Sequence, residues 1–471
     1  MRTLSDVVKA YDVRGLVGEQ IDASVTRALG TAFAEEVTGD AVAGPPVSRV
    51  VVGYDMRPSS PELSRAFAEG VASRGLDVVL IGLCSTDGLY YASGSLQAPG
   101  AMFTASHNPA AYNGIKMCRS GARPIGADTG LVRIRERAEQ LLDGAAGATD
   151  EPTGTITSED QLAGYAGYLR GLVDLSAVRR LRVVVDAGNG MAGLTTPAVL
   201  GTAAGLPALP LDVVPLYFEL DGTFPNHEAN PLEPANLRDL QAAVVREGAD
   251  LGLAFDGDAD RCFVIDERGE PVSPSAVTAL VARREIGKER AAGRQATVIH
   301  NLITSRAVPE VIAEAGGIAV RTRVGHSYIK AEMAEHRAVF GGEHSAHYYF
   351  RDFWFADTGM LAAMHVLAAL GEQVRPLSAL AAEYQRYVAS GEINSRVDDV
   401  PAADARVEAA FAGRDGVRLD RLDGLTVIGT DWWFNLRPSN TEPLLRLNAE
   451  AADLALMEKV RDEVLSLVRN G

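Results

Sequence analysis

Three aspartates alternate with small residues in the segment Asp256-Gly257-Asp258-Ala259-Asp260-Arg261. Three carboxylates on so short a turn repel one another, by on the order of 4 kcal/mol per pair at 4 Å for an effective dielectric of about 20. A divalent cation removes that penalty, and all-oxygen ligands favour Mg²⁺ or Ca²⁺ over zinc. A solvated acidic turn is the alternative. The segment predicts a metal site with Asp256, Asp258 and Asp260 as ligands.

Two familiar motifs have better explanations than the sites that they imitate. The aspartate spacing imitates an EF-hand calcium loop, with Glu267 at the twelfth position. However, the sixth position holds Arg261 instead of glycine, and both flanks are strand-like. Residues 188–193 match G-x-G-x-x-G after a strand, with Asp212 about twenty residues later, as in dinucleotide-binding proteins. We prefer a tight glycine turn that lets a strand pack closely against a helix.

A second candidate is Ser106, in the polar turn Thr104-Ala105-Ser106-His107-Asn108-Pro109. The apolar run before it, residues 100–103, reads as a buried strand, and open α/β sheets bind ligands at the carboxyl ends of their strands. Serine, asparagine and proline are also ordinary turn residues, so the turn alone leaves both interpretations open. As a nucleophile, Ser106 would need an activating neighbour.

Two further loops carry side chains suited to a phosphorylated sugar. Glu343 and Ser345 could accept from and donate to sugar hydroxyls. His344 and His347 have two residues between them and no cysteine cluster nearby, so we favour sugar contact over zinc binding. A polar turn between prolines is one interpretation of the last loop. The other is a phosphate site, because the Arg437 fork matches phosphate and the next donors are Ser439, Asn440 and Thr441.

Three similar series of apolar runs lead into the first three loops, which indicates a repeated unit. Helical stretches with apolar residues at three- and four-residue spacing lie between the runs, at 61–74, 236–247 and 306–314. Strands that alternate with helices predict α/β domains with mixed, largely parallel sheets. The runs are 50–52, 77–81 and 101–103 in the first series, 182–185, 211–218 and 251–255 in the second, and 296–299, 318–320 and 338–340 in the third.

The remainder predicts a fourth, α+β domain. Residues 371–376 read as a hinge, 377–387 and 452–468 as helices, and 427–436 and 444–451 as strands. The stretch 144–154 has the composition of a linker. The predicted domains are 1–148 with the Ser106 loop, 155–270 with the aspartate loop, 271–372 with the Glu343 loop and 373–471 with the Arg437 loop.

Composition, net charge and cysteine spacing exclude several classes of protein. A chain of 471 residues, 47% of them hydrophobic, fits a soluble globular protein of roughly three or four domains. The net charge of −17 argues against nucleic acid or an anionic membrane as the main partner. The three cysteines form no C-x-x-C pair, the first residues lack the apolar core of a signal peptide, and no apolar stretch could span a bilayer. We therefore expect a cytoplasmic protein.

Taken together, these loops resemble the α-D-phosphohexomutase superfamily, most closely its bacterial phosphomannomutase/phosphoglucomutase branch. The resemblance begins at residues 10–15, Ala-Tyr-Asp-Val-Arg-Gly, and continues through the Ser106 and aspartate loops. It extends through residues 324–327 to the Glu343 and Arg437 loops, and so covers nearly the whole chain. It implies three similar α/β domains and a C-terminal α+β domain around a central cleft.

The resemblance implies a mutase that interconverts hexose 6-phosphate and hexose 1-phosphate, with mannose and possibly glucose as the sugar. Ser106 would carry a phosphoryl group, give it to the substrate to form a bound 1,6-bisphosphate, and recover the other phosphate. Hexose 1,6-bisphosphate would act as activator, and one Mg²⁺ would be held by Ser106 and the three aspartates. The implied catalytic residues are Ser106, Arg14, Lys116, His326 and Arg261, of which Lys116 and His326 are candidate proton acceptors. The implied substrate-binding residues are Tyr11, Glu343, His344, Ser345, His347, Arg437, Ser439, Asn440 and Thr441.

We expect sugar phosphates as partners and a monomer or homodimer. Two other functions are a phosphoglucosamine mutase and a non-catalytic sugar-phosphate sensor. Phosphoglucosamine mutases usually carry Glu-Gln-Ser-Gly-His where residues 343–347 read Glu-His-Ser-Ala-His, which disfavours that activity. A non-catalytic sugar-phosphate sensor would not require Ser106 and three aspartates. Ala346 stands where many members of the family have glycine, and Ile303 is apolar near a position where the family often has a basic residue. Which sugar is preferred therefore stays open.

Overall fold

The computed structural model describes residues 3–39, 46–144, 153–438 and 444–469. The chain divides into two compact units. The first unit contains residues 1–272 and 346–378, and the second contains residues 273–345 and 379–471. The boundary crosses the predicted sugar loop, because Ser345 belongs to the second unit and Ala346 to the first.

The first sheet of the first unit combines parallel and antiparallel strands. β2, β3, β4 and β7 run parallel, and β5 is antiparallel to both β4 and β1. The order is β1–β5–β4–β2–β3–β7, with β6 beside β5. The strands are β1 (Val13–Leu16), β2 (Arg49–Tyr54), β3 (Asp77–Leu83), β4 (Gly100–Phe103), β5 (Tyr112–Arg119), β6 (Arg123–Pro124) and β7 (Ile156–Ser158).

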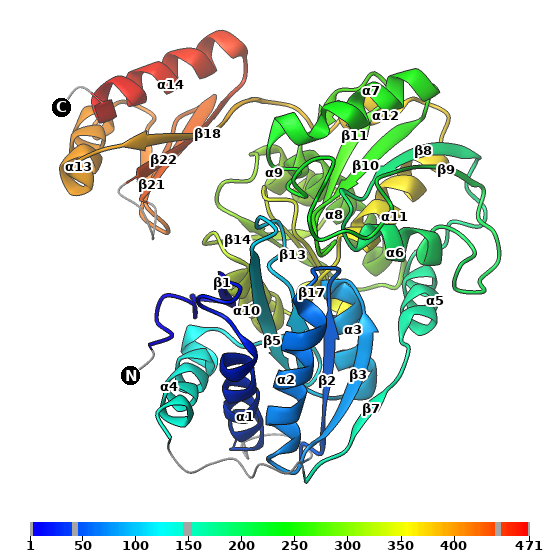
Figure 1. The fold of residues 1–471 in the computed structure, drawn as a ribbon. Coiled ribbons are helices and arrows are strands. Elements are labelled where there is room, and N and C mark those ends of the chain that lie inside the picture. The colour runs from blue at the N-terminus through cyan, green and yellow to red at the C-terminus, as the bar shows by residue number, and fades with distance from the viewer. Residues whose placement is uncertain (1–2, 40–45, 145–152, 439–443, 470–471) are drawn as a thin grey trace. The chain divides into compact units, whose positions relative to one another are not determined.

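Helices cover both faces of this sheet, which explains why its central strand is continuously apolar. Val50 and Val52 of β2 face one core, whereas Val51 faces the other. Figure 1 shows α1 and α2 side by side against the first of these faces. The helices are α1 (Ala23–Gly39), α2 (Ser60–Ala72) and α4 (Leu131–Leu142) with the 3₁₀ turn η1 (Ala127–Thr129), and α3 (Thr86–Leu96) on the opposite face.

The second sheet of the first unit has the order β12–β11–β10–β8–β9. Its parallel strands are β8 (Leu181–Asp186), β9 (Leu211–Leu216) and β10 (Leu251–Phe255), and the antiparallel ones are β11 (Cys262–Asp266) and β12 (Pro271–Val272). The hairpin β16 (Tyr348–Phe350) and β17 (Ala356–Asp357) completes the unit's strands. Its other helical elements are α5 (Leu162–Leu172), α6 (Ala192–Val199), η2 (Pro234–Leu237), α7 (Arg238–Glu247), η3 (Arg351–Phe353) and α11 (Gly359–Gly371). The short helix α12 (Leu377–Ala381) begins in the first unit and ends in the second.

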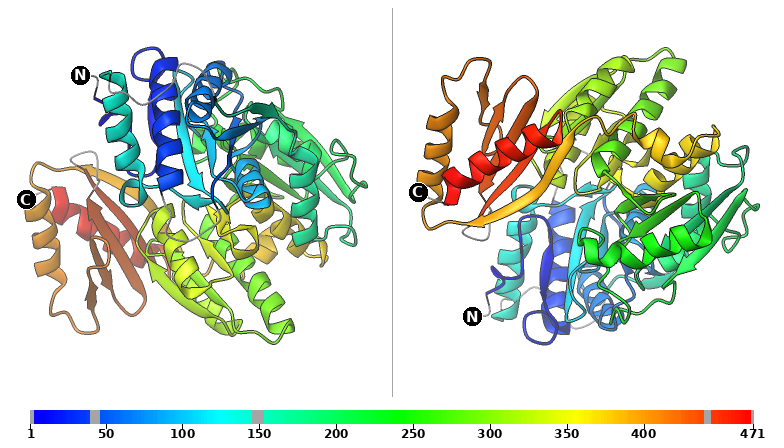
Figure 2. Two further views of the ribbon diagram at one scale, coloured as in Figure 1. Left: turned by 90° about the horizontal axis from the view of Figure 1, so that it is seen from below. Right: turned by 90° about the horizontal axis from the view of Figure 1, so that it is seen from above.

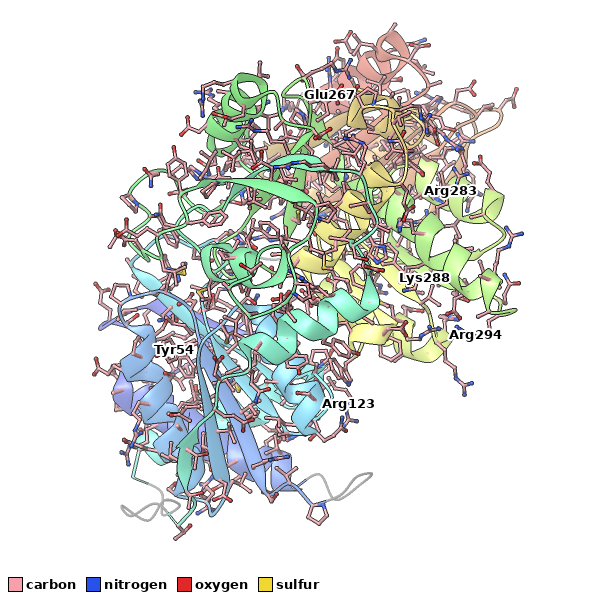
Figure 3. All side chains as sticks on the ribbon, turned by 90° about the vertical axis from the view of Figure 1, so that its right-hand side faces the viewer. Tyr54, Arg123, Glu267, Arg283, Lys288 and Arg294 are labelled. Atoms are coloured by element: carbon pink, nitrogen blue, oxygen red, sulfur yellow. The ribbon has the colours of Figure 1, made fainter. Side chains whose placement is uncertain are left out.

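The second unit opens with another parallel arrangement. β13 (Thr297–Asn301) lies between β14 (Ile318–Thr322) and β15 (Phe340–Gly342), parallel to both. The helices are α8 (Pro274–Ala291), α9 (Ala307–Glu314) and α10 (His326–His336). Figure 3 shows Lys288 and Arg294 at the surface, where they pair with the buried Glu285 at 2.9 Å and Glu289 at 2.6 Å. These cations offset the cost of burying the two carboxylates.

The second unit ends in an antiparallel sheet of order β18–β22–β21–β20–β19. Its strands are β18 (Val388–Arg396), β19 (Arg418–Asp420), β20 (Leu425–Ile428), β21 (Trp432–Pro438) and β22 (Leu444–Ala451). The helices α13 (Val400–Phe411) and α14 (Leu454–Arg469) cover one face, coloured orange and red in Figure 2, and their apolar side chains form one core with the strands. The predicted class, α/β with a C-terminal α+β part, is confirmed.

Two predicted elements are wrong. The helix expected at 377–387 is α12, which ends at Ala381. The strand expected at 427–436 is two strands, β20 and β21, joined by a turn in which Gly429 N donates to Trp432 O at 2.9 Å. Residues 145–152 of the predicted linker lie outside the described residues. Within the described part of the chain, no helix is long and apolar enough to cross a membrane.

Candidate active site

Ser106 lies directly beyond β4, as the sequence predicts for a side chain at the end of a buried strand. Its backbone takes the left-handed conformation, with φ 49°, and its amide donates to Thr104 Oγ1 at 2.8 Å. The hydroxyl donates to Asp256 Oδ2 at 3.0 Å, and the residue is buried. A serine held in this sparsely populated conformation is typical of functional sites.

The aspartate loop is the turn between the antiparallel strands β10 and β11. It approaches the Ser106 loop so closely that a Cβ on Gly257 would lie 2.5 Å from Ser106 O. Glycine is therefore required at this position for the two loops to touch. The approach brings Ser106 and Asp256, which are 150 residues apart in the chain, into direct contact.

Lys116, on β5, joins the other two aspartates. Its Nζ donates to Asp258 Oδ2 at 2.7 Å and to Asp260 Oδ2 at 2.6 Å. Among the described residues, the second oxygen of each carboxylate, Asp258 Oδ1 and Asp260 Oδ1, is buried and accepts no hydrogen bond. Buried oxygens without a donor are costly unless a cation binds them.

The three aspartates fit a hard divalent cation. Asp256, Asp258 and Asp260 can each offer an oxygen, and these oxygens lie within 4.8 Å of one another. Carboxylate oxygens are the ligands that Mg²⁺ prefers. With Lys116 and Arg261 as the neighbouring cations, the cluster keeps one net negative charge, which a divalent cation would reverse.

The protein environment separates the pKa values of these carboxyls. Burial and the neighbouring carboxylates raise the pKa of Asp256 to about 7, although Arg261 opposes the shift. Burial also acts on Asp258, but Lys116 and Thr86 outweigh it and hold the pKa of Asp258 below its usual range. The same two carboxylates, Asp258 and Asp260, raise the pKa of Lys116 despite its burial. Lys116 is therefore a charged donor here, and its predicted role as proton acceptor stays a prediction.

Arg261 and His107 both lie beside the Ser106 hydroxyl and contact each other. Arg261 Nε donates to Asp256 Oδ2 at 2.9 Å, and its Nη2 lies 3.4 Å from Ser106 Oγ. Arg261 also contacts Nδ1 of His107, an atom 3.2 Å from Ser106 Oγ. Burial, Arg261 and Arg14 lower the pKa of His107 to about 2, so its ring is neutral. Arg261 is thus the permanent positive charge nearest the hydroxyl among these groups.

Arg14 and Tyr11 come from the amino-terminal segment. Arg14, on β1, donates through Nε to Asp12 Oδ2 at 2.8 Å and through Nη1 to Asn108 Oδ1 at 2.5 Å. It therefore contacts the loop that carries Ser106. Tyr11 precedes β1 and is half-buried.

His347 lies with the aspartate loop in the first unit. His347 forms an isolated antiparallel bridge with Arg261, and its Nδ1 is 3.1 Å from Asp357 Oδ2 and 3.9 Å from Asp260 Oδ1. Burial lowers the pKa of His347, but the two carboxylates outweigh it and raise the pKa overall. Its predicted contact with sugar stays a prediction.

The other members of the sugar loop belong to the second unit. Glu343 is buried and accepts from Ser345 Oγ at 3.0 Å. His344 Nδ1 lies 3.0 Å from Ser275 Oγ, which itself accepts from Ser305 N at 3.0 Å.

Arg437, near the end of β21, pairs in register with Arg446 of β22. Glu392 is the nearest carboxylate, 4.0 Å from Arg437 Nη2 and 3.4 Å from Arg446 Nη1. Arg437 Nε is buried and has no hydrogen-bond partner among the described residues. Two adjacent guanidinium groups suit an anion. Ser439, Asn440 and Thr441 lie outside the described residues, as does the side chain of His326, with which α10 begins.

The glycine motif at 188–193 serves packing. A Cβ on Gly190 would lie 2.7 Å from Gly257 O, and Met191 N donates to that same oxygen at 2.9 Å. The motif thus supports the aspartate loop from behind, as a close-packed turn.

Sequence reasoning missed Arg57 and Thr86, two buried residues that hold these loops. Arg57 donates to Ser106 O at 3.0 Å, and Thr86 Oγ1 donates to Asp258 Oδ2 at 2.6 Å. Both follow the carboxyl ends of parallel strands, β2 and β3. The rule that identified Ser106 beyond β4 could have identified them as well.

Four family models match the chain in succession. They are described as phosphoglucomutase/phosphomannomutase α/β/α domain I (residues 5–142), domain II (163–269), domain III (273–387) and C-terminal domain (392–467). The chain is 41% identical over 465 residues to a Xanthomonas campestris protein named for phosphohexose mutases, covering 98% of each chain. It is 38% identical to a Salmonella montevideo phosphomannomutase, also over 98% of each.

Solved structures give the same result. A phosphoglucomutase/phosphomannomutase family protein from Burkholderia thailandensis is 31% identical with a TM-score of 0.86, covering 100% of this chain and 99% of the other. A Thermus thermophilus structure, called a putative phosphomannomutase, shares the fold at 23% identity and a TM-score of 0.80, over 98% of each chain. The chain therefore belongs to the phosphoglucomutase/phosphomannomutase family of phosphotransferase isomerases.

Proposed function

We propose that this protein interconverts hexose 6-phosphate and hexose 1-phosphate through a phosphoserine at Ser106 and a bound 1,6-bisphosphate. One observation carries the proposal: the Ser106 hydroxyl lies 3.0 Å from Asp256 and 3.4 Å from Arg261, in a cluster with two buried carboxylate oxygens that accept no hydrogen bond from the described residues. A serine in contact with a cation-binding cluster and a fixed guanidinium suits phosphoryl transfer. The domain boundaries 1–148, 155–270, 271–372 and 373–471 are part of the proposal.

Asp256, Asp258 and Asp260 would hold one Mg²⁺, together with an oxygen of the Ser106 phosphate. When bound, Mg²⁺ would neutralise charge on the phosphoryl group during transfer. Arg261 would contribute a second positive charge beside the oxygen atoms of the phosphoryl group. Lys116 keeps two of the carboxylates oriented through its two hydrogen bonds.

The transfer itself exchanges one P–O bond for another. The bond from phosphorus to Ser106 Oγ breaks while a bond to the free sugar hydroxyl forms, and the proton of that hydroxyl passes to a base. His326 and Lys116 are the proposed bases for the two halves of the reaction. Lys116 carries a proton while it is bonded to Asp258 and Asp260, so it would act as a base only after it had given up that proton. Ser106 Oγ takes up a proton as it leaves. In the second half, Ser106 Oγ loses that proton and attacks the other phosphate of the bisphosphate, while the bond from that phosphorus to the sugar oxygen breaks and the sugar oxygen takes up a proton. The enzyme thereby regains its phosphate, and the isomer leaves.

The second unit supplies only part of the proposed recognition of substrate, because Tyr11, Arg14 and His347 belong to the first unit. Arg437, with Ser439, Asn440 and Thr441, would bind the phosphate that is not being transferred. Glu343 and Ser345 would read hydroxyls common to both orientations of the sugar, and His344, His347 and Tyr11 would add contacts. Arg14 would orient the phosphorylated loop through Asn108.

The test is the intact mass of the purified protein before and after incubation with glucose 1,6-bisphosphate, followed by peptide mapping. We expect one phosphoryl group on Ser106, its loss in Ser106→Ala together with mutase activity, and its retention in Ser95→Ala, a matched change on α3. Absence of phosphate at Ser106 under every priming condition would overturn the proposal in favour of a sugar-phosphate sensor. Parallel assays with mannose, glucose and glucosamine 1-phosphates would then identify the sugar, with mannose expected to be the best substrate.

A further inference from the structure

Among the described residues of the first unit, Arg57 is the most completely buried arginine. Its guanidinium and its partner carboxylate, Asp55, are both fully buried, and Arg57 Nε donates to Asp55 Oδ2 at 3.2 Å. Asp55 Oδ1 is held in turn by Ser60 Oγ at 2.7 Å and by the Arg57 amide at 3.0 Å. The ion pair is therefore neutral overall and fixed on the β2–α2 connection.

The four remaining N–H groups of Arg57 all donate to backbone carbonyls of residues 106–112, that is, of the loop that carries Ser106 and of Tyr112, the first residue of β5. Nη2 donates to Ser106 O at 3.0 Å and Asn108 O at 2.6 Å, and Nη1 donates to Pro109 O and Tyr112 O, both at 2.9 Å. With Nε on Asp55, all five donors of the guanidinium are used.

These bonds give hydrogen-bond partners to backbone carbonyls of the Ser106 loop. Ser106 O and Asn108 O lie in the loop, outside the helices and strands that the structure describes, and each unsatisfied buried carbonyl is costly. Pro109 O also accepts from Tyr112 N at 3.0 Å, so its bond to Arg57 is a second one. Ser106 also needs support because its φ is 49°. A lysine offers three donors from a single point and cannot reproduce this planar fork.

We propose that Arg57 is a positioning residue for phosphoryl transfer, which fixes the backbone of the Ser106 loop by binding four of its carbonyls at once. The inference rests on the proposed function, since it assumes that Ser106 is the phosphorylated residue. Arg57 acts through the backbone of the Ser106 loop. It bonds neither to the Ser106 hydroxyl nor to the three carboxylates of the aspartate loop. Its positive charge is already balanced by Asp55, so its contribution is geometry more than electrostatic attraction.

The central test is Arg57→Lys, compared with wild type in the rate at which glucose 1,6-bisphosphate phosphorylates Ser106, followed by quenched intact mass. A displacement of about 1 Å at a reacting group can cost about 100-fold in rate. We therefore expect phosphorylation and kcat to fall by about 100-fold, while KM for the sugar phosphate changes by less than about three-fold because Arg437 and Glu343 are untouched. Arg170→Lys is the matched control, because Arg170 also donates to three backbone carbonyls, those of Val199, Gly201 and Pro207, away from Ser106.

Two further measurements separate positioning from general stability. Guanidinium ion added to Arg57→Ala should restore part of the phosphorylation rate, whereas it should do nothing for Ser106→Ala. Hydrogen exchange in Arg57→Lys should increase in the peptide spanning residues 104–113 and stay at the wild-type level in α14. If Arg57→Lys is phosphorylated at the wild-type rate, or if its loss tracks only the melting temperature as in Arg170→Lys, the inference is wrong. A wild-type protein without phosphate at Ser106 would instead refute the proposed function.

Discussion

Thr86 offers a direct test of the proposed metal site, because it holds a ligand without being one. Its hydroxyl donates to Asp258 Oδ2 at 2.6 Å, and its amide donates to Asp258 O at 3.0 Å. Thr86→Val keeps the shape of the side chain and the amide bond but deletes the hydroxyl. Asp258 then keeps Lys116 as its remaining side-chain donor, and its free oxygen is less well oriented.

The expected loss can be sized from this single hydrogen bond. A buried hydrogen bond to a charged group contributes about 1.5–3 kcal/mol, and about 1.4 kcal/mol corresponds to a factor of ten in affinity. Partners of metal ligands typically change metal affinity by about 10- to 100-fold. We therefore expect the Mg²⁺ concentration for half-maximal mutase activity to rise by about 10- to 100-fold, with near-normal kcat at saturating Mg²⁺.

The assay is a Mg²⁺ titration of mutase activity, with a calorimetric titration of Mg²⁺ as a second readout. Thr26→Val is the control, because Thr26 is equally buried but its hydroxyl bonds to its own helix, 3.2 Å from Asp22 O. The reasoning fails if the two variants lose similar stability and Thr86→Val keeps the wild-type Mg²⁺ dependence. It also fails if excess Mg²⁺ does not restore the activity of Thr86→Val.

Three further outcomes follow from particular contacts. Gly257→Ala should abolish most mutase activity, because its Cβ would lie 2.5 Å from Ser106 O; activity within two-fold of wild type would contradict the close approach. Arg437→Met should raise KM for the sugar phosphate by about 10- to 100-fold with a smaller change in kcat, as steady-state kinetics will show. Burial lowers the pKa of His227, but its bond to Asp186 outweighs burial and raises it above 6.5 overall. The stabilisation by this pair is thus complete below about pH 6.5 and is lost as pH rises through the folded-state pKa. Urea unfolding should therefore show that His227→Gln lowers the free energy of unfolding by more at pH 6 than at pH 8.5.

The sequence predicts the candidate site well wherever the chemistry is local. Ser106 and the three aspartates each follow a buried strand, and the rule that ligands lie at strand ends needs only the apolar run before them. The same local evidence misses Arg57, because its partners are backbone carbonyls about fifty residues later in the chain. Every residue has such a carbonyl, so no residue type marks the ones that Arg57 binds. Long-range partners of this kind depend on the register of β2 beside β4, which apolar patterns alone leave undefined.

The two wrong elements have different physical causes. Between Ala381 and Tyr387 there is no glycine or proline to end a helix, so the end of α12 depends on tertiary contacts. There Arg386 binds Glu314 at 2.6 Å, and the Tyr387 hydroxyl donates to Glu310 at 2.7 Å. The turn between β20 and β21, by contrast, contains Gly429-Thr430-Asp431, which are turn-forming residues hidden within a long apolar alternation.

The arrangement of the first unit explains why the proposed metal and the proposed phosphoserine would depend on each other. The five charged groups around Ser106 sum to one net negative charge, and a phosphoryl group would add about two more. Without a cation that total is hard to hold in a buried site, because the low dielectric strengthens every repulsion. With a divalent cation, the two additions nearly cancel. Binding of the proposed cation and retention of the proposed phosphate would therefore favour one another by linkage. Both would need the close approach of the two loops, in which Gly257 and Arg57 each lie against Ser106 O.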